Sequence, residues 1–171
     1  SHWTTPRSDD TPVMSHTLMR SKIFPVADES RKTTLLLIDN FRYDQWRAIS
    51  SLLRGYYDVV QDDFYCAILP TATQYARNAI FAGLMPLSID RLMPGKWLND
   101  NEEGGKNQYE EEFLRRLMTQ SGKQWKFSFD KLVRPEQGRR LVDNIQKVYD
   151  ADFSVIIYNF LDILSHARTE T

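Results

Sequence analysis

A single apolar run constrains this chain more than any other feature of its sequence. Six uncharged residues, Thr33 to Ile38, read Thr-Thr-Leu-Leu-Leu-Ile, and Asp39 follows them directly. An uninterrupted run of this kind predicts a strand buried on both faces, as in a parallel sheet with helices on each side. Ligands of such sheets bind beyond the carboxyl ends of the strands, so Asp39 becomes a candidate site residue.

The rest of the chain alternates between helical and strand-like patterns. Apolar residues recur at helical spacing in four segments, 43–53, 73–84, 109–118 and 138–149. Shorter apolar runs predict strands over 56–60, 64–69, 125–129 and 153–161. A long loop is expected over 93–108. This alternation predicts an α/β fold with a mostly parallel sheet and helices on both faces.

The beginning of the chain has a different character. Residues 1–32 contain three prolines and many Ser, Thr and Asp residues, with little apolar periodicity. They are predicted to be a linker or an irregular lead-in, and residues 33–171 the folded domain. His2 and His16, both in this lead-in, are expected to be solvated and not ligands.

Composition excludes several classes of protein. The 171 residues include 22 Lys and Arg against 23 Asp and Glu, so no basic excess indicates a nucleic-acid partner. The only cysteine, Cys66, fits a reducing compartment and is predicted to be a buried strand residue. No apolar run approaches the roughly 20 residues that span a bilayer. A soluble, cytoplasmic protein without membrane insertion is therefore expected.

Asp39 has two chemical interpretations. A carboxylate at a strand end can bind a divalent metal ion through its oxygens. The alternative is that Asp39 caps the following helix by accepting hydrogen bonds from backbone N–H groups.

Thr73 and Arg77 form a second candidate group, within Leu69-Pro-Thr-Ala-Thr-Gln-Tyr-Ala-Arg77. Thr73 is predicted at the start of a helix, where free N–H groups favour a phosphate. Its hydroxyl can become a nucleophile if a metal or base lowers its pKa. Arg77, one turn later, could pair with phosphate oxygens. The alternative is that Thr73 is an ordinary helix N-cap.

Asp162 and His166 form a third candidate group, just beyond the last apolar run. An Asp and a His four residues apart can converge on one zinc ion. His166 is also the only histidine of the predicted domain. A doubly wound sheet would bring all these strand ends to one edge.

Three motifs, LLLIDNFRYDQW, LPTATQYARN and NFLDILSHART, resemble successive motifs of the PglZ domain, a branch of the alkaline phosphatase superfamily. The closest resemblance is to the PglZ domain of PorX-type response regulators, which are linked to type IX secretion. It extends over residues from about 23 to 171.

The resemblance implies a zinc-dependent phosphoesterase that cleaves a phosphodiester of nucleotide type. Asp39 would bind one of two zinc ions, and Thr73 would be the nucleophile between them, forming a phosphothreonine. Asp162 and His166 would hold the other zinc ion. The contact of Arg77 with the substrate is expected from its spacing to Thr73, not from the resemblance. The family's later Asp-His and more distal His ligands do not occur before Thr171. The chain is therefore expected to be the N-terminal part of the domain, truncated and inactive by itself.

Other functions stay open at this stage. A non-catalytic PglZ module could bind a sigma factor or a secretion-system protein. A truncated sheet would leave apolar edges, so a homodimer is also possible. A phosphatase of the haloacid dehalogenase type is disfavoured, because that chemistry requires a second Asp where this chain has Phe41.

Overall fold

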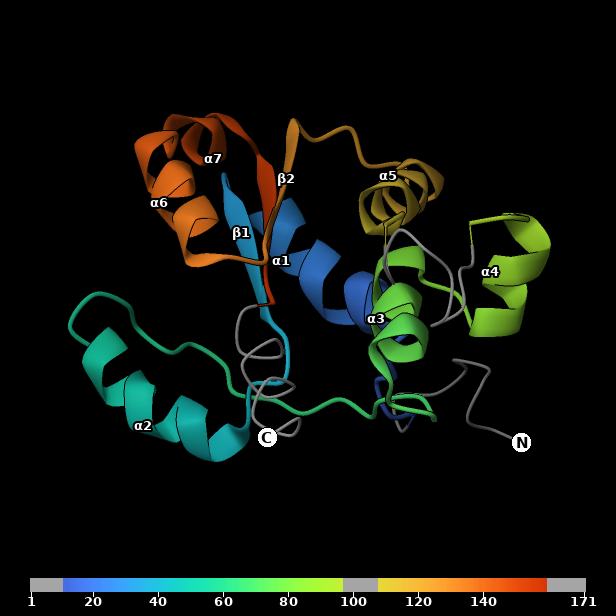
Figure 1. Ribbon diagram of the computed structural model, residues 1–171, viewed down its shortest axis with the longest axis horizontal. Coiled ribbons are helices and arrows are strands. Elements are labelled where there is room, and N and C mark those ends of the chain that lie inside the picture. Colours follow the sequence, from blue (N-terminus) through green and yellow to red (C-terminus); the bar gives the residue numbers. More distant parts are fainter. Residues whose placement is uncertain (1–10, 97–107, 160–171) are drawn as a thin grey trace. The chain divides into compact units, whose positions relative to one another are not determined.

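The computed structural model describes residues 11–96 and 108–159 (Figure 1). The chain divides into two compact units. One, Ser1–Glu29 with Asp63–Gln124, is called the helical unit here; the other, Ser30–Asp62 with Trp125–Thr171, is called the sheet unit. The chain therefore builds the first strand and helix of the sheet unit before it returns to the helical unit.

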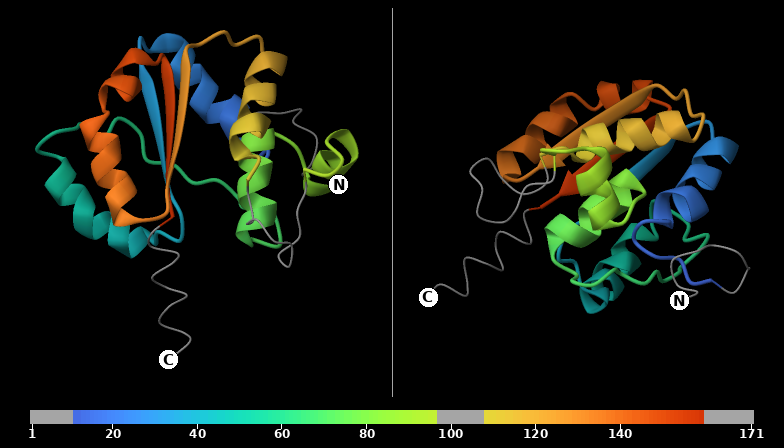
Figure 2. Two further views of the ribbon diagram at one scale, coloured as in Figure 1. Left: turned by 45° about the horizontal axis from the view of Figure 1, so that its top comes forward. Right: turned by 90° about the vertical axis from the view of Figure 1, so that its right-hand side faces the viewer.

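The described residues of the sheet unit form three parallel strands, β1 (Thr33–Ile38), β2 (Phe127–Leu132) and β3 (Phe153–Tyr158), in the order β1-β3-β2. Helices α6 (Pro135–Asp143) and α7 (Gln146–Asp150) connect β2 to β3 and run along one face of the strands (Figure 2). This arrangement confirms the predicted α/β fold with a parallel sheet flanked by helices, which is consistent with an alkaline-phosphatase-like fold.

The prediction that the run ending at Asp39 is buried on both faces is wrong. Strand β1 pairs only with β3 in the described part of the sheet, and Leu36 on β1 is 56% exposed. The central strand is β3, in which Phe153, Val155 and Ile157 are completely buried. A continuous apolar run therefore occurs here in a strand with one covered face.

Helix α2 (Tyr43–Leu53) has the bounds that its apolar spacing predicted. Its start is stabilised by Gln45, whose Oε1 accepts the backbone N–H of Arg42 at 2.9 Å. The helix has the predicted apolar face, but this face is exposed: Leu52, for example, is 73% exposed.

Several other boundaries differ from the predictions. The expected strand at 125–129 lies at 127–132, and the expected helix at 138–149 is divided into α6 and α7. Residues 153–158 form the last strand, and residues 160 and 161 of that prediction lie outside the described residues.

The helical unit contains a π-helical turn, η1 (Met19–Ile23), and the helices α1 (Phe24–Glu29), α3 (Thr73–Ala82), α4 (Pro86–Leu92) and α5 (Glu110–Gln120). Helices α3 and α5 pack against each other, and each has buried apolar residues, such as Phe81 on α3 and Leu117 on α5. The predicted helix at 73–84 ends at Ala82 because Gly83 adopts a left-handed φ of 62°.

The lead-in is more ordered than its composition predicted. Residues 19–29 are helical, and they bury Met19 and Phe24. His16 is partly buried, not solvated, and its Nδ1 atom has no hydrogen-bond partner. Burial lowers the pKa of this histidine.

The strands predicted at 56–60 and 64–69 do not form. Residues 57–65 have no regular structure, and Cys66 makes only an isolated bridge with Met14. Cys66 is also exposed, which corrects the expectation of a buried strand residue. Of the predicted loop at 93–108, residues 97–107 lie outside the described residues.

None of the helices in the described ranges combines the length and the apolar character needed to cross a bilayer.

Candidate functional site

Asp39 lies where β1 ends, as its position in the sequence predicted. Its backbone N–H donates to the carbonyl oxygen of Tyr158 at 3.0 Å, so the ladder with β3 continues through this residue. Asn40 then takes a left-handed conformation with φ of 55°, and its N–H donates to Oδ1 of Asp39 at 3.1 Å. Asparagine is one of the few residues that adopt this conformation readily. The turn therefore holds the carboxylate near the carboxyl edge of the sheet.

The alternative role of Asp39 as a helix cap is wrong. The N-cap of α2 is Arg42, three residues further along the chain. Arg42 instead forms two hydrogen bonds with Asp44, from Nε to Oδ1 at 2.9 Å and from Nη2 to Oδ2 at 2.7 Å. The side-chain hydrogen bond raises the pKa of Arg42 and lowers that of Asp44. Both side chains are solvent-exposed, so their ion pair belongs to the surface.

The carboxyl edge of the sheet also carries Asn159, at the end of the central strand. Its backbone N–H donates to the carbonyl oxygen of Leu132 at 2.9 Å. Asn159 begins the motif NFLDILSHART, from which no role was predicted for it. The signal that could have revealed it is that Asn159 is the first polar side chain after Ile156-Ile157-Tyr158, which would have ended the predicted strand at residue 158 and not at 161.

Thr73 is the first residue of α3, as predicted, and lies in the helical unit. The helix N-cap is Ala72, so the alternative role of Thr73 as an N-cap is wrong. The side chain of Thr73 is partly buried. Asp39 belongs to the sheet unit. The surroundings of Thr73 and of Asp39 are therefore each described within one unit.

Arg77 lies one turn after Thr73, but its guanidinium faces the interior. Its Nε donates to Oε1 of Glu110 on α5, and the side chains of the two residues are 5% and 1% exposed. Gln74 and Asn78 on the same helix are also buried, and the oxygen of each carboxamide lacks a hydrogen-bond partner. Arg77 thus has a structural partner, and its contact with a substrate stays a prediction.

Asp162 and His166 lie outside the described residues. Within 11–96 and 108–159, no three His, Cys, Asp or Glu residues gather closely enough to hold a metal ion. The predicted donors, carboxylates with one imidazole, are ligand types that zinc accepts. The described part of the chain contributes only Asp39 and Thr73 to that set, so the zinc site stays a prediction.

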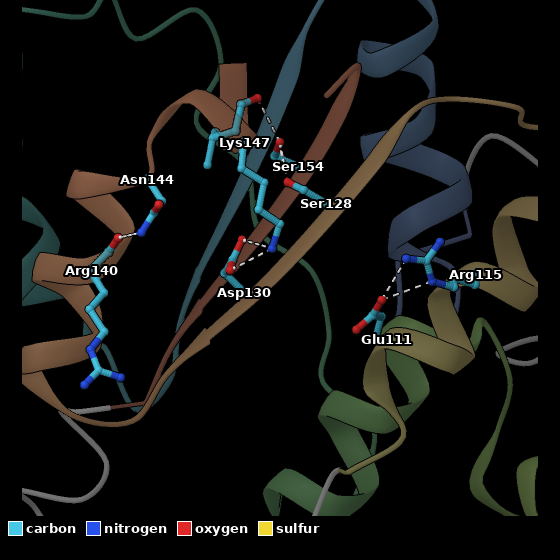
Figure 3. A network of polar contacts seen from close by, with 9 residues as sticks. Glu111, Arg115, Ser128, Asp130, Arg140, Asn144, Lys147 and Ser154 are labelled. Atoms are coloured by element: carbon cyan, nitrogen blue, oxygen red, sulfur yellow. Dashed lines mark hydrogen bonds and ion pairs between the residues drawn. The ribbon is translucent and has the colours of Figure 1, made fainter. Parts of the chain in front are cut away.

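The sheet unit also has an open cavity of about 860 Å³ between β2 and the helices α6 and α7. Inside it, Lys147 donates to both carboxylate oxygens of Asp130 at 3.0 and 3.2 Å. Deeper in the unit, Ser128 donates to Oγ of Ser154 at 2.9 Å (Figure 3). The cavity is lined by charges of both signs and contains none of the predicted site residues. Because none of those residues lines it, it is not the candidate site.

Comparison with protein families identifies a family that matches most of the chain. Residues 18–171 match the family described as the BREX system PglZ alkaline phosphatase-like domain. The match begins close to η1, so it includes the ordered helices of the lead-in. No curated protein matches the chain at a significant level. Because the match extends over most of the chain, this protein belongs to the PglZ family of alkaline-phosphatase-like domains.

Proposed function

We propose that this chain carries part of the active site of a zinc-dependent phosphoesterase. The observation that supports this proposal most strongly is the position of Asp39 at the carboxyl end of a parallel strand, in a chain of an alkaline-phosphatase-like family. Carboxyl ends of parallel strands are where such folds bind ligands.

The site residues have distinct tasks in this proposal. Asp39, together with Asp162 and His166, would hold the zinc ions. Bound zinc would lower the pKa of a coordinated hydroxyl and withdraw charge from the phosphoryl oxygens. The Oγ atom of Thr73 attacks phosphorus and loses its proton, while the bond to the ester oxygen breaks and that oxygen leaves as an alcohol. Water then hydrolyses the phosphothreonine and restores the hydroxyl of Thr73. A phosphodiester of nucleotide type is the proposed substrate.

The biological setting is a further part of the proposal. The three motifs resemble PorX-type proteins, which suggests a cytoplasmic response regulator connected with type IX secretion. A sigma factor or a secretion-system protein would then be its partner. The motif resemblance alone supports this setting.

A second candidate is a non-catalytic module that binds a protein partner. It is favoured by the exposed apolar residues on α2 and just after it, among them Tyr56 at 84% and Val60 at 95% exposure. Such a surface is typical of an interaction site. Zinc-dependent hydrolysis of a phosphodiester is expected of the phosphoesterase and not of the non-catalytic module, so its measurement distinguishes the two candidates.

The test measures zinc content and hydrolysis of bis(4-nitrophenyl) phosphate. It uses this chain and a longer protein that supplies the further ligands expected from the family resemblance. The longer protein should bind about two zinc ions and hydrolyse the diester, whereas the chain alone should show little activity. Thr73→Ala should abolish hydrolysis while the protein stays folded, which circular dichroism would show.

Thr71→Ala is the matched control, since Thr71 is exposed and precedes α3. It should leave hydrolysis unchanged. If Thr73→Ala retained the activity of the unmodified protein, the nucleophile would be misassigned. If the longer protein bound no zinc and hydrolysed nothing, the non-catalytic module would be the better description.

A further inference from the structure

Asp39 and Asn159 occupy adjacent positions at the carboxyl edge of the sheet. The parallel register of β1 and β3 pairs Ile38 with Tyr158. The hydrogen bond from Asp39 N–H to the carbonyl oxygen of Tyr158 is the one this register requires when the ladder continues by one residue. Asp39 is therefore the cross-strand neighbour of Asn159.

Strand β2 holds Asn159 in the same register from its other side. Leu132 pairs with Tyr158, and the N–H of Asn159 donates to the carbonyl oxygen of Leu132. Asn159 is thus fixed by a hydrogen bond to β2 while it lies beside the end of β1. Its backbone position is more strongly constrained than that of a residue at the end of an edge strand.

The side chains of Asp39 and Asn159 belong to the same face of the sheet. Successive side chains alternate between faces, so odd-numbered residues of β1 and β3 share the face that buries Val155 and Ile157. Neighbouring strands are about 4.8 Å apart. A carboxamide on one strand can therefore reach a carboxylate at the adjacent position of the next.

We infer that Asn159 is a positioning residue for Asp39. Its Nδ2–H donates a hydrogen bond to the Asp39 carboxylate and orients it toward the space beyond the strand ends. A carboxylate has about four lone-pair sites, and the N–H of Asn40 uses one of them. A hydrogen bond from Asn159 to one carboxylate oxygen is compatible with a metal ion bound to the same group. This inference rests on the proposed function only for the role of Asp39 as a metal ligand.

The first experiment measures zinc affinity in the longer PglZ protein by competition with a chromophoric chelator. Groups that orient metal ligands typically change metal affinity by about ten- to a hundredfold. Asn159→Leu, which keeps the side-chain shape without a donor, should weaken zinc binding by about that factor. Asp39→Ala should weaken it at least as much.

The matched control is Asn144→Ala in the same unit. Asn144 donates from Nδ2 to the carbonyl oxygen of Arg140 at 2.8 Å, at the end of α6 (Figure 3). Its loss should lower the urea midpoint of unfolding but leave zinc affinity unchanged. If Asn144→Ala lowers stability without changing zinc affinity, a general loss of stability does not explain weaker zinc binding by Asn159→Leu.

The second experiment needs neither zinc nor an altered Asn159. The side-chain NH₂ resonances of Asn159 are recorded by NMR in this chain before and after Asp39→Ala. Loss of the acceptor should move the resonances of Asn159 and leave those of Asn144 in place.

The two experiments separate failure of the inference from failure of the proposed function. If Asp39→Ala weakens zinc binding but Asn159→Leu does not, the inference is overturned and the metal role of Asp39 survives. If Asp39→Ala leaves zinc affinity unchanged, the metal role fails, and the contact is then judged by NMR alone. Unmoved Asn159 resonances after Asp39→Ala would overturn the contact itself.

Discussion

Neutralising Glu110 should destabilise the protein far more than neutralising Glu111, the next residue of the same helix. Glu110 is 1% exposed and accepts a hydrogen bond from the buried guanidinium of Arg77. Glu111 is 45% exposed and pairs with Arg115 at 2.8 Å on the surface (Figure 3). Both glutamates lie in the first turn of α5, so both interact favourably with the helix dipole. Burial is the main difference between them.

The expected magnitudes follow from that difference. Removing one partner of a buried ion pair typically costs about 3 to 5 kcal/mol, because the other charge stays in a poorly solvated place. An exposed pair four residues apart on a helix contributes only about 0.3 to 0.5 kcal/mol. We therefore expect Glu110→Gln to cost about ten times as much as Glu111→Gln.

Urea unfolding followed by circular dichroism measures both effects as double-mutant cycles. With a slope of about 2 kcal/mol per molar urea, a loss of about 4 kcal/mol lowers the midpoint by about 2 M. Arg77→Met with Glu110→Gln should cost less than the two single changes added together, because the double change removes both charges of the buried pair. The exposed pair, tested as Arg115→Met with Glu111→Gln, should be nearly additive. Equal losses for Glu110→Gln and Glu111→Gln would refute the argument that the buried pair is structural.

Two further predictions concern single positions in the helical unit. Gly83→Ala should lower the stability of the protein more than Gly122→Ala. Both glycines have a positive φ, 62° and 69°, so both substitutions strain the backbone. Only at Gly83 would the added Cβ meet Leu117, at 2.6 Å, whereas nothing lies within 4 Å of the added Cβ at Gly122. Urea midpoints of the two variants isolate the packing cost, and equal losses would contradict it. For His16, burial lowers the pKa, so the unfolded chain takes up a proton that the folded chain does not as the pH falls below about 6.5. The unmodified chain should therefore lose more stability than His16→Gln between pH 7.5 and pH 5, and parallel losses in the two would show that this histidine does not contribute.

Local signals predicted α2, α3 and α5, but not α1 and α4, and they predicted α6 and α7 as one helix. The bounds of α2 and the start of α3 agree with the apolar spacing, because helical hydrogen bonds and caps connect residues only a few positions apart. The strand predictions were less successful. Residues 56–60 and 64–69 have apolar, β-prone sequences but form no strand, since strand formation needs a partner from elsewhere in the chain.

The candidate site residues show the same contrast between what local sequence predicts and what depends on distant parts of the chain. Local sequence was sufficient to place Asp39 after a strand and Thr73 at the start of a helix. It also suggested Arg77 as a substrate contact, because Arg77 lies one turn from Thr73. The pairing of Arg77 with Glu110, which is 33 residues away along the chain, could not be read from that spacing.

The sequence by itself determined that a strand at 33–38 is followed by helix α2, and it contained the motifs that resemble the PglZ family. Only the tertiary structure decided that β3 is the central strand, that β1 has an exposed face, and that Asn159 lies beside Asp39. The physical reason is that periodicity and capping are local, whereas sheet order, register and burial depend on contacts between segments far apart in the chain.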